Sequence, residues 1–394
     1  LDHTRNYMIG KSIHVVGVFV VALLLVGQAG EVAAQTTAVP FLLISPSSRN
    51  SAMGESGVAI ADDVSAIFWN PAGLGFQRGM ELSLNHSNWL PQFAQSDLFF
   101  EYASYKMDVP SIGGTLGAAL TYLNLGEFER RDEGNNPLGT FKSYEIAFTT
   151  SYGTQLDEDF ALGVGLRIIH SSLSVVATAR EQGSGTATAV AGDVGILYRP
   201  SKFTLPFSNT DIGGRFGIGA SITNIGPSIS YIDEDQADPL PTALRLGFSY
   251  DLVKEKYNTL TWTTDVTKLL VSRTDRKADP FYEAIYKSWD VDNVMNTFTL
   301  GTGFEYWYSQ LVALRFGFFH EDPSLGNRRF LTFGAGVRYD IYGFDFSYIS
   351  TAISDDDTVS PLSETLRFTL TVNWNRGSGP ADDGTRIPAD DAAN

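Results

Sequence analysis

Residues 215–224 read RFGIGASITN, and they alternate apolar residues with small or polar ones at nearly every step. Phe216 and Ile218 fall on one face of an extended chain, whereas Arg215 and Ser221 fall on the other. A period of two residues is the signature of a β-strand whose two faces meet different surroundings. The stretch therefore predicts a strand with an apolar environment on one side and a polar one on the other.

The same alternation recurs along most of the chain and predicts about fourteen strands. An even number of long antiparallel strands is typical of closed barrels in bacterial outer membranes. We therefore expect an all-β fold, a 14-stranded antiparallel transmembrane β-barrel. The expected strand cores are 81–89, 96–107, 113–125, 141–152, 160–171, 188–198, 215–223, 242–250, 259–268, 297–307, 311–320, 330–340, 342–350 and 365–374.

The lengths of the predicted connections support this interpretation independently. Bacterial barrels alternate short periplasmic turns with long external loops. The second, fourth, eighth, tenth and twelfth connections are short, and the long ones are expected at 126–140, 224–241, 269–296 and 351–364. The sixth connection, 199–214, is longer than a periplasmic turn should be. Aromatic residues at strand ends predict an interfacial girdle: Tyr152, Tyr198, Tyr250, Tyr306, Trp307, Tyr339 and Trp374.

Composition excludes several classes of function. The formal net charge is −17 and the sequence pI is about 4.6, so a nucleic-acid backbone would be repelled. The chain contains no cysteine, which excludes disulfides, thiolate metal sites, a cysteine nucleophile and a lipoprotein anchor. Acidic clusters at 233–235 and 355–357 are interpreted as solvated surface, with Ca²⁺ binding as the alternative.

The N-terminus has the features of a secretory signal peptide. Lys11 precedes an apolar run over 15–26, and small residues lead to an expected cleavage site after Ala34. Translation is expected to start at Met8. The predicted division of the chain is a signal peptide at 1–34, an N-terminal plug or head at 35–79, the barrel at 80–375 and an acidic disordered tail at 376–394.

Residues 41–76 combine many glycines and prolines with a high content of large apolar side chains. Pro46 and Pro71 prevent a long helix or a regular strand. A solvated linker would not need residues such as Phe68 and Trp69, so the segment should be packed inside something. The inward faces of the strands are rich in glycine, which leaves room for it, and we predict that it forms a plug.

The polar faces of the strands should line the lumen. Both signs of charge are present there, and we interpret them as pairs that brace a filled interior, because unpaired buried ions are costly. A polar permeation path is the alternative. The predicted lining residues are Arg167, Arg215, Arg245, Arg315, Arg338, Arg367, Glu145, Asp193, Asp265, Glu305 and Asp345.

Signals for catalysis are weak. His86, His170 and His320 show no metal-ligand spacing. Ser56 lies between Gly54 and Gly57, and the second glycine comes one residue too early for a nucleophile elbow. We therefore expect no catalytic residues, no metal and no cofactor, and we interpret the protein as a non-enzyme.

The head of the chain resembles a known family. Its sequence is similar to the N-terminal region of FadL-like outer-membrane barrels, which have fourteen strands and an N-terminal plug. The opening FLLISP with the following arginine is more narrowly similar to the PorV/PorQ family of the type IX secretion system, whereas the barrel shares only the architecture. The residues that carry the resemblance are Arg49, Met53, Gly54, Asp62, Asp63, Trp69, Asn70, Pro71, Ala72 and Gly73.

The resemblance implies an outer-membrane barrel that binds the giant type IX translocon channel. It also implies that the barrel shuttles cargo with a C-terminal signal domain to a surface sortase complex. The Asn-Pro-Ala motif alone is shared with fatty-acid transporters, so a transporter of hydrophobic small molecules is the alternative. A third hypothesis is an enzyme acting on outer-membrane lipid, an activity attributed to the family, but no nucleophile is found for it. Outer-membrane lipid is the expected environment, and no nucleic-acid partner is expected.

Overall fold

The computed structural model describes residues 36–92, 98–131, 134–174, 185–206, 209–231, 236–275, 277–323, 325–350 and 362–374. The predictions of a signal peptide, of a C-terminal tail and of acidic clusters at 233–235 and 355–357 lie outside these residues. Within the described part, no helix is long and apolar enough to span a membrane.

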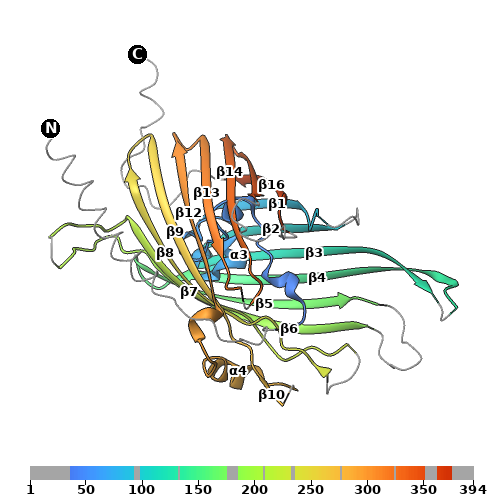
Figure 1. The fold of residues 1–394 in the computed structure, drawn as a ribbon. Coiled ribbons are helices and arrows are strands. Elements are labelled where there is room, and N and C mark those ends of the chain that lie inside the picture. Colours follow the sequence, from blue (N-terminus) through green and yellow to red (C-terminus); the bar gives the residue numbers. More distant parts are fainter. Residues whose placement is uncertain are drawn as a thin grey trace.

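Fourteen strands form one closed antiparallel barrel, as predicted, and the first and last of them pair with each other (Figure 1). Most observed ends lie within a few residues of the predicted ones. The barrel strands are β1 (Met80–Asn88), β2 (Phe99–Val109), β3 (Gly114–Arg131), β4 (Pro137–Gln155), β5 (Phe160–Ser172), β6 (Thr186–Tyr198), β7 (Phe216–Ile225), β8 (Ala243–Lys254), β9 (Asn258–Leu269), β12 (Phe298–Tyr308), β13 (Val312–His320), β14 (Arg329–Tyr339), β15 (Tyr342–Ser350) and β16 (Leu366–Trp374).

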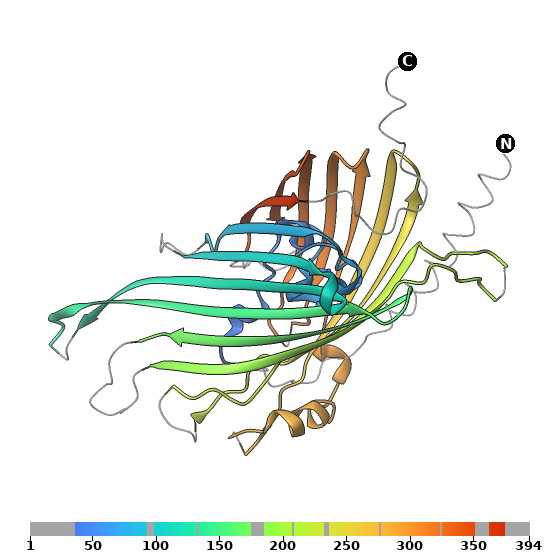
Figure 2. The same cartoon turned by 180° about the vertical axis from the view of Figure 1, so that it is seen from behind.

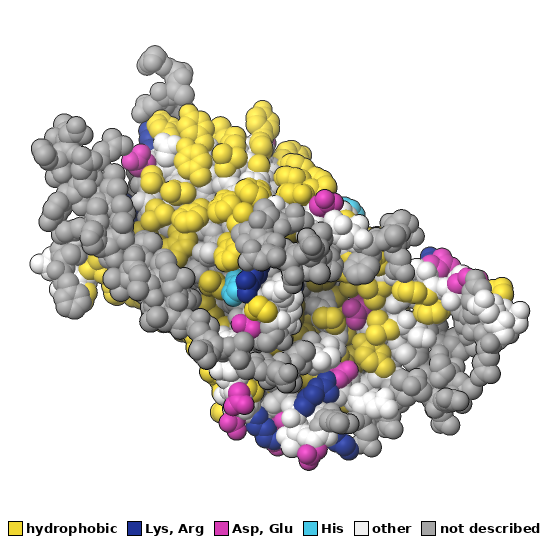
Figure 3. All heavy atoms as spheres, in the orientation of Figure 1, with side chains coloured by type: hydrophobic (Ala, Val, Ile, Leu, Met, Phe, Trp, Pro, Cys, Tyr) yellow, Lys and Arg dark blue, Asp and Glu magenta, His cyan; other side chains and the backbone are white. Residues whose placement is uncertain are grey.

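The alternation in the sequence becomes an apolar outer face and a buried inner face. In β5, Leu162, Val164 and Leu166 are exposed, whereas Arg167 between the apolar positions is buried. Figure 3 shows hydrophobic side chains gathered over the outer surface of the barrel. A closed barrel with this outer face suits a lipid environment because every backbone group of its strands is paired within the sheet.

The two ends of the barrel differ in their connections. Turns 110–113, 156–159, 309–311 and 340–341 lie at one end, which we call the short-turn end. The other end, called the long-loop end, carries the connections 226–242 and 270–297 among others. In bacterial barrels the short turns face the periplasm and the long loops face the outside.

The third connection is shorter than predicted, because most of the expected loop at 126–140 is strand. β3 and β4 continue to pair through Glu127 with Lys142 and Phe128 with Phe141. The two phenylalanine rings stack with centroids 5.7 Å apart. These cross-strand pairs stabilise a long hairpin, which projects beyond the rest of the barrel in Figures 1 and 2.

The connection between β9 and β12 has a structure of its own at the long-loop end. It contains a two-stranded hairpin of β10 (Arg273–Thr274) and β11 (Lys277–Ala278), the helix α4 (Phe281–Lys287) and the short helix η5 (Val294–Thr297). Asp279 accepts hydrogen bonds from the hydroxyls of Ser272 and Thr274 and from Lys287 Nζ at 2.7, 2.8 and 2.9 Å. One carboxylate thus ties the hairpin to α4.

Residues 36–79, which we call the head segment, lie inside the barrel. They form η1 (Pro40–Leu43), α2 (Ser48–Ser51), α3 (Ala66–Trp69) and η2 (Pro71–Phe76), all of which are short (Figure 2). The segment starts at the long-loop end, where Ala38 N donates to Pro239 O at 3.0 Å. It ends at the short-turn end, where Arg78 Nη2 donates to Gln155 Oε1 at 2.9 Å. The chain therefore runs along the lumen before it enters β1.

Inward glycines allow the close approach of the head segment to the strands. A Cβ on Gly303 of β12 would lie 2.5 Å from Met53 Cα. Gly54 has φ +68°, a conformation that favours glycine, and a Cβ there would lie 2.5 Å from Thr302 O. The apolar residues of the segment, such as Phe41 and Trp69, are buried in the largest core cluster.

Candidate functional site

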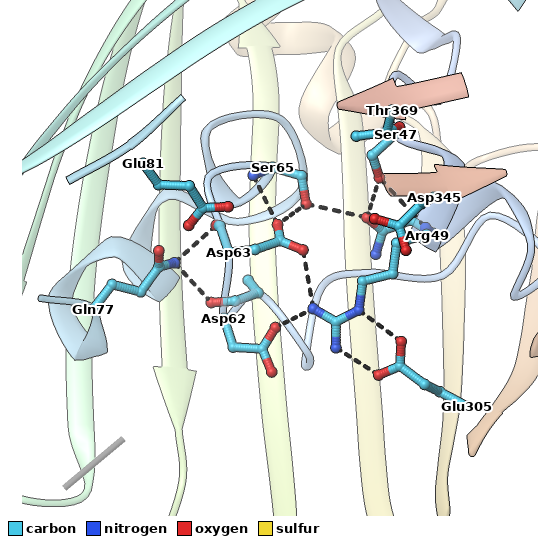
Figure 4. A network of polar contacts seen from close by, with 12 residues as sticks. Ser47, Arg49, Asp62, Asp63, Ser65, Gln77, Glu81, Glu305, Asp345 and Thr369 are labelled. Atoms are coloured by element: carbon cyan, nitrogen blue, oxygen red, sulfur yellow. Dashed lines mark hydrogen bonds and ion pairs between the residues drawn. The ribbon is translucent and has the colours of Figure 1, made fainter. Parts of the chain in front are cut away.

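The centre of the polar interior is Arg49 on α2 (Figure 4). Its Nε and Nη2 donate to Glu305 Oε2 and Oε1 of β12 at 2.9 and 2.7 Å, which is a bidentate pair. Its Nη1 pairs with Asp62 and lies 2.9 Å from Asp63 Oδ2. One guanidinium thus joins two parts of the head segment to the barrel wall.

The network continues along the wall of the barrel. Arg315 of β13 lies 2.7 Å from both Glu305 Oε2 and Asp345 Oδ1. Arg338 Nη2 lies 2.6 Å from Asp345 Oδ2. Trp307, predicted to belong to the interfacial girdle, instead faces the lumen, where Arg315 and Arg338 lie 5.5 and 5.3 Å from its ring centroid. That prediction was wrong because strand alternation places residue 307 on the same face as Glu305.

Asp63 is held by the head segment itself. Ser65 N donates to Asp63 Oδ1 at 2.8 Å, and the Ser65 hydroxyl also bonds this carboxylate. Burial raises the pKa of Asp63, but the Arg49 guanidinium and the bonds from Ser65 outweigh burial and hold the pKa below its usual value. Asp63 is therefore a fixed anion in the folded state at neutral pH.

The Asn-Pro-Ala motif caps η2 and binds the segment to the barrel. Asn70 Oδ1 accepts from Ala72 N at 3.1 Å, as a helix cap does. Asn70 Nδ2 donates to Val58 O at 3.2 Å and to Ile196 O of β6 at 2.9 Å. Pro71 occupies the first position of η2, where its missing N–H costs nothing, and Gly73 packs against the Ala61 backbone.

Two further lumen residues contact the head segment directly. Asp265 Oδ2 of β9 accepts from the backbone N–H groups of Gly57 and Val58 at 2.6 and 2.9 Å. Arg245 of β8 lies 5.1 and 5.5 Å from the ring centroids of Phe68 and Trp69. Both contacts join residues that are far apart in sequence, and both depend on the head segment lying inside the barrel.

The remaining predicted lining residues lie away from the Arg49 network. Arg167 Nη2 lies 3.0 Å from Asp193 Oδ2, and Glu145 accepts from the Ser171 hydroxyl at 2.9 Å. Arg215 was predicted to begin a strand, but β7 begins one residue later, at Phe216. The Arg215 side chain is only partly buried. Arg367 is buried in β16, and its closest carboxylate contact is Glu55 of the head segment.

Two buried lysines were not predicted from the sequence. Lys106 Nζ lies 3.8 Å from Glu81 Oε2 and donates to Arg78 O at 3.1 Å. Lys268 is buried, donates to Thr297 Oγ1 at 2.7 Å and lies 5.2 Å from the Trp289 ring centroid. The polar face of the predicted strand contained the signal for Lys106, because this residue alternates with the buried Tyr102 and Ser104. Lys268 falls on the outer face of β9, one residue out of phase with Asp265, and it is buried by the 270–297 connection.

Comparison with known proteins identifies the family. A family model described as "Type IX secretion system protein PorV" matches residues 28–276, which is well over half of the chain. The chain belongs to the PorV family. The resemblance seen in the head is therefore confirmed. PorV proteins are type IX secretion system proteins, and membership together with the barrel fold places this chain in the outer membrane. From the general rule for bacterial barrels, we expect the long-loop end to face the outside of the cell and the short-turn end to face the periplasm.

Solved structures similar to this PorV-family chain are outer-membrane barrels. The Ralstonia pickettii toluene transporter TbuX has 14% identity and a TM-score of 0.46, with 82% of this chain and 97% of TbuX covered. The Pseudomonas putida toluene transporter TodX has 13% identity and a TM-score of 0.47, with coverages of 82% and 97%. A Pseudomonas aeruginosa FadL homologue has 11% identity and a TM-score of 0.43, with coverages of 83% and 98%. No curated protein sequence matches the chain.

Proposed function

We propose that this chain binds the type IX translocon channel and shuttles cargo with a C-terminal signal domain to the surface attachment machinery, without catalysing a reaction itself. The match of residues 28–276 to the PorV family is the observation that carries this proposal. The described lumen supports it, because its charged side chains hold the head segment in place.

We also propose that the head segment acts as a plug. Arg49 binds it to β12, Asn70 binds it to β6 and Asp265 binds it to β9. Contacts to three separate strands oppose its withdrawal in any single direction. A plugged barrel is better suited to presenting an outer surface to partners than to passing cargo through its lumen.

The connection 270–297 supplies a surface for such a partner. Tyr282 and Tyr286 on α4 are exposed, and Tyr286 exposes 78% of its side chain. Exposed tyrosines on an otherwise tethered element are typical of protein interfaces. Since α4 lies at the long-loop end, these side chains face outward, where exported cargo or the translocon would be met.

The experiment is affinity purification of the tagged protein from the native bacterium after mild detergent extraction. Recovery of a very large barrel protein together with secreted cargo is expected. The variant Y282A/Y286A should recover several-fold less of one or both partners. The variant Y339A is the matched control, because Tyr339 also exposes 78% of its side chain but lies at the short-turn end.

Recovery of neither a large barrel nor cargo would refute the proposal. Saturable binding of a fatty-acid probe by the purified protein, without any such partner, would instead favour a transporter of hydrophobic small molecules. Equal recovery by Y282A/Y286A and the wild type would refute the proposed role of α4, but not the proposed secretion function.

A further inference from the structure

Arg367 differs from the other buried arginines of the lumen. It is the second residue of β16, it is 1% exposed, and it pairs in register with Ser87 of β1 and Ser347 of β15. These partners place it in the half of the barrel nearer the long-loop end. The side chain therefore lies inside the barrel on the side that faces the outside of the cell.

The Arg367 guanidinium has no hydrogen-bond partner among the described residues: its Nε, Nη1 and Nη2 are all buried and unbonded. Arg367 forms a long ion pair with Glu55, whose Oε1 lies 3.9 Å from Nη2. That distance is too long for a hydrogen bond. By contrast, Arg315 forms ion pairs at 2.7 Å with two carboxylates.

The surroundings of Arg367 are polar on one side and aromatic on the other. The Ser347 hydroxyl, on the residue directly opposite, is also buried and unbonded within the described part of the chain. Directly opposite residues on one face of a sheet have Cβ atoms about 5 Å apart. The Arg367 guanidinium carbon lies 6.0 Å from the Trp89 ring centroid.

A buried guanidinium without a hydrogen-bond partner is costly, and native proteins rarely leave one in that state. Its planar fork of donors matches the two oxygens of a carboxylate or a phosphate group. Glu55 would compete only weakly with such a group for Arg367, because its carboxylate lies 3.9 Å away and accepts no hydrogen bond from the guanidinium.

We propose that Arg367, with the Ser347 hydroxyl, binds an oxyanion, either a carboxylate or a phosphate group. The ligand satisfies the free donors of Arg367, and Glu55 opposes its binding by like-charge repulsion. This inference is independent of the proposed secretion function, since it rests on side chains of β15, β16 and the head segment alone.

Tryptophan fluorescence of the purified protein in non-ionic detergent tests the proposal. Trp89 lies beside Arg367 and serves as the reporter. Sodium acetate and inorganic phosphate are titrated separately, with sodium chloride keeping the ionic strength constant. A saturable change with either oxyanion is expected, and the tighter of the two identifies the preferred group. The change should vanish in W89F.

Variants separate binding from structure. R367Q should bind at least about tenfold more weakly, because charge-assisted hydrogen bonds are lost, and R367K should be intermediate. E55Q should bind about threefold more tightly, which a purely structural role of Arg367 does not predict. Each variant is first shown to be folded by its heat-modifiable migration in gel electrophoresis.

Three results would overturn the proposal: no saturable change with either oxyanion, an unchanged titration in R367Q, or a structure determined in phosphate that shows only water at Arg367. If R367Q does not fold, E55Q still decides the matter, because tighter binding supports the site and unchanged or weaker binding contradicts it.

Discussion

The substitution R49M removes the guanidinium at the centre of the lumen network and replaces the arginine with an uncharged side chain of similar length. In the wild type, Arg49 binds Glu305 through two bonds of 2.9 and 2.7 Å and also pairs with Asp62 and Asp63. The Arg49 and Glu305 side chains are 13% and 4% exposed. The variant therefore leaves a buried carboxylate with one cationic partner fewer.

Removing one partner of a buried ion pair typically destabilises a protein by about 3–5 kcal/mol. Arg315 still binds Glu305 at 2.7 Å in the variant, which reduces the cost. Asp62 is partly exposed and can be solvated by water. We therefore expect R49M to lower the free energy of unfolding by about 2–4 kcal/mol.

The assay is urea unfolding in lipid vesicles, combined with amide hydrogen exchange over the head segment. R78M is the matched control, since Arg78 is an exposed arginine of the same segment, and its hydrogen bonds to described residues go to two backbone carbonyls and to the Gln155 side chain. It should cost less than about 1 kcal/mol. Faster exchange of head-segment amides is expected in R49M only. Equal unfolding midpoints and equal exchange in the two variants would refute the reasoning.

The pH dependence gives a second readout of the same contact. The pKa of Asp63 is lowered in the folded state, so its contribution to stability is complete above the ordinary aspartate pKa of about 4 and is lost as the pH falls below it. In R49M the main source of that lowering is gone. The wild type should therefore lose more stability than R49M between about pH 5 and pH 3. Parallel acid profiles would contradict this assignment.

Three other predictions concern the head segment and the loops. G303A should destabilise the barrel by about 1–3 kcal/mol in urea, because its Cβ would meet the Met53 backbone, whereas G192A, whose Cβ meets nothing closer than 3.8 Å, should change little. D279A removes the shared acceptor of the β10–β11 hairpin and α4, so it should speed protease cleavage at α4 without shifting the barrel's unfolding midpoint; unchanged cleavage would contradict the tether. In this cysteine-free chain, T36C should react with a membrane-impermeant maleimide on intact cells and S111C only after lysis, and the reverse pattern would contradict the orientation.

The strands were predictable because alternation is local. Each strand shows its two faces within about ten residues, as in β5, where Leu162 and Val164 face out and Arg167 faces in. The extension of the β3–β4 hairpin was missed because residues 126–140 contain glycines and charges typical of loops. Cross-strand pairs such as Phe128 with Phe141 stabilise it, and such pairs are visible only once the register is known.

The candidate site was predictable only in part. The sequence indicated an apolar head and an inward charged face, but the Arg49 and Glu305 side chains that meet are 256 residues apart. Nothing local distinguishes Glu305, which is paired twice, from Glu145, which accepts a hydrogen bond from a serine. Trp307 was assigned to the girdle because tryptophans at strand ends are common there, and its cationic neighbours become apparent only in the folded barrel.

The most direct test of the central claim is the location of cargo in a strain that lacks the gene. The proposed function predicts that proteins with C-terminal signal domains accumulate in the periplasm and return to the cell surface when the wild-type chain is restored. Cargo that reaches the surface in normal amounts without this protein would contradict the account.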